Sequence, residues 1–111
     1  MNWTQLNSID QLEQISDQSF EIPVVIFKHS TSCGLSSMVL RKLEESITDG
    51  HKQDYQFYFV DLHSYREVSN AVAEKWAVEH ESPQMLLIKS NELVLSESHF
   101  SIEAELLDSN H

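Results

Sequence analysis

Glycine and proline are scarce in this chain of 111 residues, which holds two of each. Phosphate-binding loops of the P-loop and dinucleotide-binding types need several closely spaced glycines, so their absence excludes both. With 41% hydrophobic residues, the chain is neither disordered nor low in complexity. We therefore expect a single domain over residues 1–111 that folds around its own hydrophobic core.

Basic residues are also few, with 7 Lys and Arg against 18 Asp and Glu and a formal net charge of −11. Such a charge repels phosphate backbones and anionic membranes, so we expect neither nucleic acid nor a membrane as a partner. The apolar runs at 24–27 and 85–88 are far shorter than the roughly 20 residues that span a bilayer. The first ten residues lack the basic and apolar segments of a signal peptide, and a cytoplasmic protein is expected.

Cysteine occurs once, at Cys33, which excludes an intramolecular disulfide framework and favours a reducing compartment. None of the six histidines stands at zinc-finger spacing from Cys33, so no metal is expected. The remaining question is what a single thiol does in this chain.

The hydrophobic pattern predicts alternating strands and helices. Strands are expected at 3–6, 23–28, 56–62, 84–89 and 93–97, and helices at 8–18, at 35–48, from 64 through Trp76, and after Ser101. Capping boxes are predicted at Ser8–Gln11 and Ser64–Glu67, and Asp49–Gly50 is expected to end the second helix. The first helix is expected to bury Ile9, Leu12 and Ile15. Early alternation followed by a closing hairpin predicts an α/β fold, a three-layer α/β/α sandwich with a mixed central sheet.

Cys33 is placed at the first turn of the helix at 35–48, directly after a buried strand. Unpaired N–H groups and the positive end of the helix dipole favour the thiolate there, and the thiolate is the nucleophilic form. The alternative is a small buried hydrophobe, the commonest role of a lone cysteine. Its neighbours, Ser30, Thr31, Ser32 and Ser36, are polar and argue against that alternative.

Two nearby side chains could support the thiolate. Ser36, three residues after Cys33, can donate a hydrogen bond to it, although ordinary bonding within the first turn is an equal alternative. His29 could be its ion-pair partner or proton acceptor, or simply a polar residue at a strand end. Further along, Pro83 precedes an apolar strand; its bond to Ser82 is either part of a simple turn or cis, as in about 5–6% of X-Pro bonds.

The segments 24-VVIFKHSTSC-33 and 72-VAEKWAVEHESPQMLLIK-89 resemble the active-site strand and cis-proline region of thioredoxin-like proteins. Together with 99-HFSI-102, they make the whole chain similar to the monothiol bacilliredoxins of the general-stress type. Those proteins carry a T-C-P-I-S motif, which here reads Ser32-Cys33-Gly34-Leu35-Ser36. Gly34 stands where the family has proline, and the change frees the backbone at the start of the helix.

The resemblance implies a thioredoxin-like fold and a thiol–disulfide oxidoreductase that removes bacillithiol from S-bacillithiolated client proteins. Cys33 would be the nucleophile, Ser36 the family's serine, and Ser82 and Pro83 the substrate-binding residues. No cofactor is implied, since bacillithiol would be a co-substrate that supplies the resolving thiol. Two alternatives remain open: a binding module without catalysis, and a redox sensor in which thiolation of Cys33 alters binding.

Overall fold

The computed structural model describes residues 1–108. The strands are β1 (Thr4–Gln5), β2 (Val24–His29), β3 (Gln56–Asp61), β4 (Gln84–Lys89) and β5 (Glu92–Ser98). The helices are α1 (Gln11–Gln18), α2 (Gly34–Ser46), α3 (Asp49–Asp54), α4 (Arg66–Lys75) and α5 (Glu105–Asp108), with a 3-10 turn η1 (His99–Ser101). All five predicted strands and all four predicted helices are present, and α3 is an addition.

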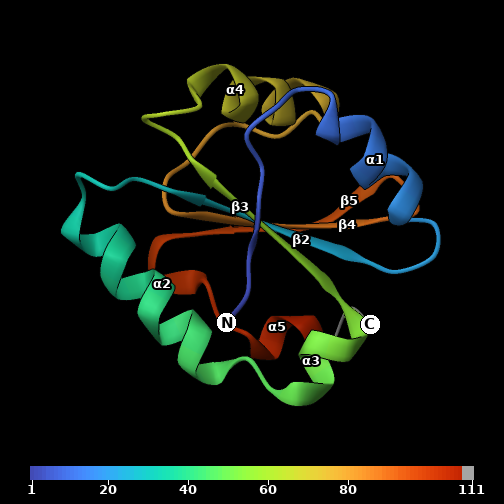
Figure 1. The fold of residues 1–111 in the computed structure, drawn as a ribbon. Coiled ribbons are helices and arrows are strands. Elements are labelled where there is room, and N and C mark those ends of the chain that lie inside the picture. The colour runs from blue at the N-terminus through green and yellow to red at the C-terminus, as the bar shows by residue number, and fades with distance from the viewer. Residues whose placement is uncertain (109–111) are drawn as a thin grey trace.

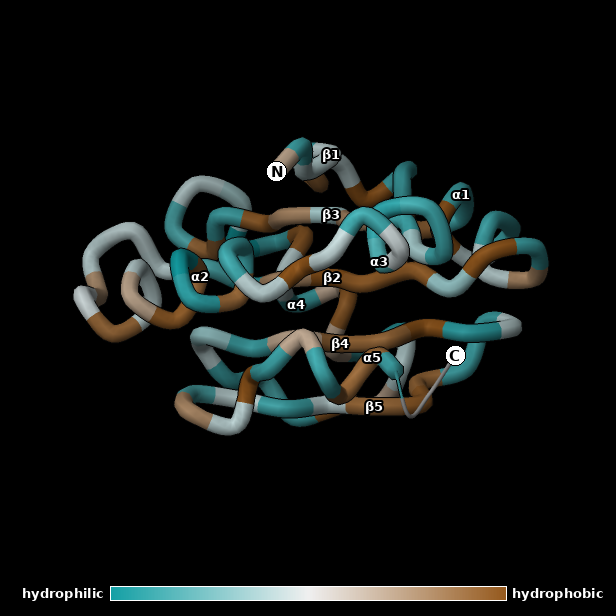
Figure 2. The backbone as a smooth tube through the Cα atoms, turned by 90° about the horizontal axis from the view of Figure 1, so that it is seen from below, coloured by the Kyte–Doolittle hydropathy of each residue, from teal (hydrophilic) through white to brown (hydrophobic). Residues whose placement is uncertain are grey.

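The five strands form one sheet in the order β1-β3-β2-β4-β5, which can be followed from top to bottom in Figure 2. β1, β3 and β2 run parallel, whereas β4 pairs antiparallel with both β2 and β5. Parallel strands need crossover helices, and α1 supplies one between β1 and β2, while α2 and α3 supply the one between β2 and β3. The mixed sheet predicted from the early alternation and the closing hairpin is confirmed.

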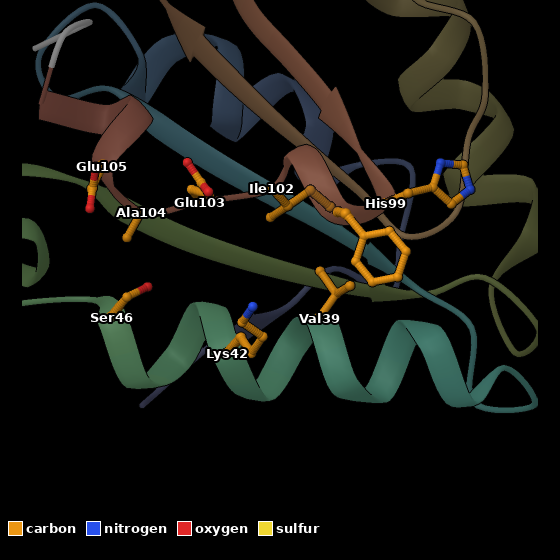
Figure 3. Close-up of a pocket in the computed structure, with 9 residues that line it drawn as sticks. Val39, Lys42, Ser46, His99, Ile102, Glu103, Ala104 and Glu105 are labelled. Atoms are coloured by element: carbon orange, nitrogen blue, oxygen red, sulfur yellow. The ribbon is translucent and has the colours of Figure 1, made fainter.

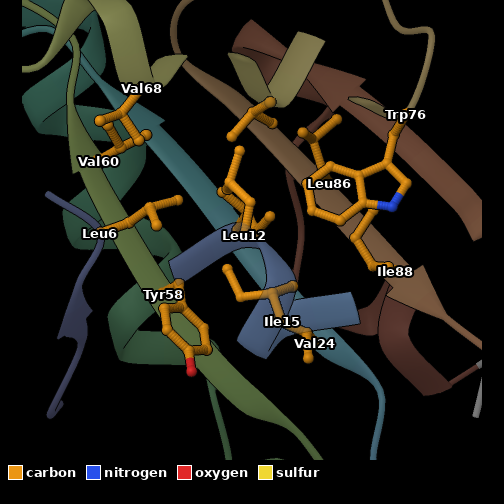
Figure 4. Packing of buried hydrophobic residues seen from close by; sticks show 12 residues of the cluster. Leu6, Leu12, Ile15, Val24, Tyr58, Val60, Val68, Trp76, Leu86 and Ile88 are labelled. Atoms are coloured by element: carbon orange, nitrogen blue, oxygen red, sulfur yellow. The ribbon is translucent and has the colours of Figure 1, made fainter. Parts of the chain in front are cut away.

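Helices cover both faces of the sheet, as Figure 1 shows: α1 and α4 lie on one side, and α2, α3 and α5 lie on the other. The buried side chains divide accordingly into two clusters. One cluster, on the face covered by α1 and α4, contains Leu12 and Ile15 of α1 and Val68 of α4 (Figure 4), together with Val72. The other includes Val39 and Leu43 of α2 and Leu107 of α5. This is the predicted three-layer sandwich.

β2 is the central strand that leads to Cys33, and all six of its residues are buried. Val25 and Phe27 face the α2 side, while Val24 and Ile26 face the α1 and α4 side. The same alternation continues into its two polar residues, so Lys28 faces α4 and His29 faces α2. Both polar side chains are buried, at 0% and 7% exposure.

The predicted first helix begins later than expected. It starts at Gln11, and Ile9, predicted to point inward, is 49% exposed. The Ser8–Gln11 capping box forms only in part: the Gln11 side chain accepts from the Ser8 N–H, while Ser8 Oγ accepts from the Asp10 N–H. A helix whose first turn starts at Gln11 leaves Ile9 outside the buried face.

The other two helix boundaries also differ from the prediction. Ser64 Oγ bonds Asp61, and the helix cap at Tyr65 has no side-chain bond, so the Ser64–Glu67 capping box is wrong. The expected helix end at residues 49–50 is also wrong: α2 ends at Ser46, and residues 49–50 begin α3, because Thr48 and His51 form a capping box there.

Within residues 1–108, no helix is both long enough and apolar enough to cross a bilayer.

Candidate active site

Cys33 is the N-cap residue of α2, with φ −112° and ψ 116°, and it is partly exposed. Its N–H donates to Ser30 O at 3.2 Å, which closes a tight loop between the end of β2 and the helix. The thiol itself makes no capping bond to the helix. The Cys33 sulfur therefore lies at the start of the first turn of α2, on a partly exposed residue that a reaction partner can approach.

The N-cap position places the sulfur of Cys33 beside unpaired N–H groups. The first N–H groups of a helix have no partner within the helix, and a side chain at the N-cap normally accepts from the second or third of them. A charged sulfur at Cys33 can take that role, and the helix dipole adds to it. The predicted placement of Cys33 is correct.

Ser36 is completely buried, and its hydroxyl joins α2 to β2. Oγ accepts from the Ser30 N–H at 3.1 Å and lies 2.8 Å from His29 Nδ1. Within residues 1–108 it makes no hydrogen bond to Cys33. The proposed donation from Ser36 to the thiolate is thus replaced by bonds to the strand end, so Ser36 fixes the loop that carries Cys33.

His29 lies on the α2 face of the sheet, and its ring packs at a tilt against Phe59, with ring centroids 5.4 Å apart. Burial lowers the pKa of His29, and the nearby carboxylates of Asp61 and Glu44 only oppose that effect. The ring is therefore uncharged at neutral pH, and its described polar partner is Ser36. An uncharged ring does not form an ion pair with a thiolate, whereas the role of His29 as proton acceptor stays a prediction, and its place at the strand end is as predicted.

The Ser82–Pro83 peptide bond is cis, as one of the two sequence-based alternatives predicted. The pairing of β2 with β4 ends with Lys28 opposite Gln84, so the next residues, His29 and Pro83, meet at the same end of the sheet. The loop that carries Cys33 leaves β2 at this end. Ser82 Oγ is buried and has no hydrogen-bond partner within residues 1–108. The pairing of β2 with β4 thus brings Ser82 and Pro83 to the end of the sheet from which the Cys33 loop extends.

His63, which sequence analysis did not single out, also belongs to this site. Its Nε2 lies 2.8 Å from Ser30 Oγ and 2.8 Å from Ser32 Oγ, on either side of the turn that leads to Cys33. His63 follows β3, which runs parallel to β2 with Asp61 opposite His29. No local motif links positions 30 and 63, so only the strand pairing reveals the contact.

Gly34, the first residue of α2, has open space around it. A Cβ built on its backbone meets nothing within 4 Å, and its φ is not in the left-handed region. The fold therefore does not require glycine here.

A hollow of about 210 Å³ lies between α2 and the segment that begins with η1. Val39 and Lys42 of α2 line one wall, and His99 and Ile102 line the facing wall (Figure 3). His99 connects the hollow to the cis-proline loop, because its N–H donates to Pro83 O at 3.1 Å. Within residues 1–108, no three His, Cys, Asp or Glu side chains gather in an arrangement that could hold a metal ion.

Comparison with known families agrees with this geometry. The model of the family described as monothiol bacilliredoxin BrxC matches residues 4–107. The chain belongs to the monothiol bacilliredoxin family. The match extends over both halves of the site, from the Cys33 loop to the cis-proline loop, and supports a thiol–disulfide redox function for this bacilliredoxin.

Solved structures confirm the thioredoxin-like fold. A protein with a thioredoxin fold, provisionally described as an oxidoreductase, is 28% identical with a TM-score of 0.80, covering 96% of this chain and 90% of that one. The thioredoxin of Malassezia sympodialis is 20% identical with a TM-score of 0.74, covering 97% and 87%. That of Fasciola hepatica is 21% identical with a TM-score of 0.70, covering 96% and 94%. The bacilliredoxin thus has the predicted fold class.

Proposed function

We propose that this bacilliredoxin removes bacillithiol from S-bacillithiolated proteins by thiol–disulfide exchange at Cys33. The observation that carries the proposal is the position of the one cysteine. Cys33 is partly exposed at the N-cap of α2, at the same end of strands β2 and β4 as Pro83. Thiol–disulfide exchange needs one accessible thiolate, and the family match indicates redox chemistry of this type.

In the first step, the Cys33 thiolate attacks the bacillithiol sulfur of a client's mixed disulfide. A new S–S bond forms between Cys33 and bacillithiol, the old S–S bond breaks, and the client leaves as a thiolate that takes a proton from water. In the second step, the thiolate of a free bacillithiol attacks the bacillithiol sulfur held on Cys33. This releases bacillithiol disulfide and restores the Cys33 thiolate, so bacillithiol is a co-substrate and no cofactor is needed.

The substrate would lie against the cis-proline loop. The backbone groups of Ser82 could bond a client or thiol placed there, whereas Ser82 Oγ is buried and has no partner among the described residues. In this mechanism the N-terminus of α2 stabilises the Cys33 thiolate, both when it attacks the client's disulfide and when the second step restores it. Since the second step consumes a reduced thiol, we place the reaction in the cytoplasm.

A turnover assay with a purified S-bacillithiolated client protein and excess bacillithiol tests the proposal. The wild-type chain should release the reduced client over many cycles, and Cys33→Ser should release none. Ser37→Ala is the matched control, because Ser37 is exposed on the next turn of α2. Turnover that survives in Cys33→Ser would refute the nucleophile. Client capture by both forms without turnover would identify a binding module instead.

A further inference from the structure

Lys28 is a buried amine that the proposed chemistry does not use. Its side chain is 0% exposed, and its Nζ donates to Ser69 O at 3.0 Å and bonds His80 Nδ1 at 3.2 Å. Within residues 1–108, no carboxylate lies within ion-pair distance of it. Lysine is almost never fully buried unless it is paired with an opposite charge.

Packing alone does not call for an amine at this position. The preceding residues on the same face of β2, Val24 and Ile26, are apolar and completely buried. A methionine or leucine at position 28 would continue that apolar stripe without the cost of burying a charge. Burial indeed lowers the pKa of Lys28 to about 8, which means that the fold disfavours its charged form. A residue that weakens the fold in this way calls for a role in function.

Two neighbouring side chains on β2 and β4 reach the same loop, residues 77–83. Lys28 and Gln84 stand opposite each other in the antiparallel pair, so their side chains lie on the same face of the sheet. Lys28 Nζ bonds His80, and Gln84 Nε2 donates to Glu79 O at 2.9 Å. His80 is exposed on its outer side and closes over the buried amine.

The loop held in this way leads directly into the candidate active site. Three residues after His80 comes Pro83, which stands at the end of the sheet from which the Cys33 loop leaves β2. Pro83 O in turn accepts from the His99 N–H. A displacement at His80 therefore has a short covalent path to Ser82 and Pro83.

We propose that Lys28 is a positioning residue, which holds the loop of residues 77–83 through its hydrogen bond to His80 so that Ser82 and Pro83 meet the substrate of Cys33. The inference rests on the proposed function, because it assigns the loop to substrate presentation. Lys28 itself touches neither the thiol nor the substrate.

The test compares Lys28→Met, His80→Ala and the double variant with wild type. Lys52→Met is the control that removes an amine of equal charge from α3, on the opposite face of the sheet. Three quantities are measured at pH 7: amide hydrogen exchange of residues 77–83, the rate of exchange of Cys33 with an S-bacillithiolated client, and the rate of its alkylation by iodoacetamide. Alkylation reports the thiolate alone, whereas client exchange also needs the loop.

Lys28→Met and His80→Ala should each speed amide exchange in residues 77–83 at least tenfold and slow client exchange roughly tenfold. Alkylation should stay within twofold of wild type. Since both residues act through one bond, the double variant should be no slower than either single variant. Lys52→Met should match wild type in all three measurements.

Unchanged amide exchange in Lys28→Met, equal losses in alkylation and client exchange, or additive losses in the double variant would each overturn the inference. His80→Ala alters a surface side chain, so it keeps the test decisive if Lys28→Met fails to fold. If wild type shows no client exchange, the proposed function fails, and amide exchange of the loop alone then decides whether Lys28 holds it.

Discussion

At the scale of single residues, the hydroxyl of Ser36 is the link between helix α2 and strand β2. It satisfies the buried N–H of Ser30 and the ring of His29 together. We expect Ser36→Ala to lower the free energy of unfolding by about 1–3 kcal/mol, since a buried donor is left without a partner. Urea denaturation measures the change. Ser37→Ala, one residue further and exposed, should stay within about 0.5 kcal/mol of wild type, and equal effects of the two variants would refute the assigned role.

His63 makes a second residue-scale contact, to Ser30 and Ser32 on either side of the turn before Cys33. His63→Ala should slow client exchange several-fold, because the turn that positions the Cys33 sulfur loses the hydrogen bonds that join Ser30 and Ser32 to His63. Global stability should change by less than about 0.5 kcal/mol, since His63 is exposed. Stopped-flow kinetics and urea denaturation separate the two effects. Wild-type kinetics in the variant would show that the turn holds its shape without His63.

The buried amine of Lys28 should leave a signature in the pH dependence of stability. Its pKa is lowered to about 8 in the folded chain, against 10.5 for an ordinary lysine. Between these values the unfolded chain binds more protons, so this group makes stability rise as pH rises. The free energy of unfolding of wild type relative to Lys28→Met should therefore increase by about 2–3 kcal/mol from pH 7 to pH 10. A flat or falling difference would mean that Lys28 is not desolvated.

At the scale of elements, the start of α2 has room for a stiffer residue than Gly34. Proline is favoured at the first position of a helix, where its missing N–H costs no helical bond. The φ of −112° and ψ of 116° at Cys33 lie close to the range that a residue before proline adopts. Gly34→Pro should raise the free energy of unfolding by about 0.4–1 kcal/mol, because the unfolded chain loses freedom.

Chemical denaturation checks this gain, with Gly34→Ala as a companion that keeps the N–H. A Cβ at this position meets nothing within 4 Å, so both variants should be at least as stable as wild type. Destabilisation by both would show that the start of α2 needs glycine for a reason other than space.

Strands and motif residues were predictable for the same physical reason, that their signals are local. The run at 23–28 is apolar because β2 is covered on both faces, and the structure has it at Val24–His29. Cys33 and Pro83 were found from their immediate neighbours. The short helix α3 was not, because its capping box uses His51 in the position where Glu or Gln is expected.

Contacts that depend on strand order were out of reach of the sequence. His63 reaches Ser30 only because β3 lies beside β2, and Lys28 reaches His80 across 52 positions of the chain. On spacing alone, Ser36 could bond the thiolate or bond within the first turn, whereas the folded strand end offers it two other partners. A pattern of residue types carries no information on which of several polar neighbours a hydroxyl will bond.

At the scale of the whole molecule, the net charge of −11 acts against the compact state through self-repulsion. Ion pairs offer little relief: Lys75–Glu13 and Lys52–Asp49 are 3.5 Å and 3.9 Å long, and both acids are exposed. Raising sodium chloride from 10 mM to 150 mM shortens the Debye length from about 30 Å to about 8 Å. The midpoint of thermal unfolding at pH 7 should therefore rise with salt, and a fall would mean that attractive pairs outweigh the repulsion.

The account as a whole depends on Cys33 as an exchanging thiol, and intact-mass analysis tests that claim most directly. Oxidised bacillithiol is added to the wild-type chain at neutral pH. Cys33→Ser is the blank, and glutathione disulfide is the competing disulfide. We predict the mass of one bacillithiol on wild type, none on Cys33→Ser, and loss of the adduct when reduced bacillithiol is added. If Cys33 gains no adduct and alkylates no faster than free cysteine, the account is contradicted.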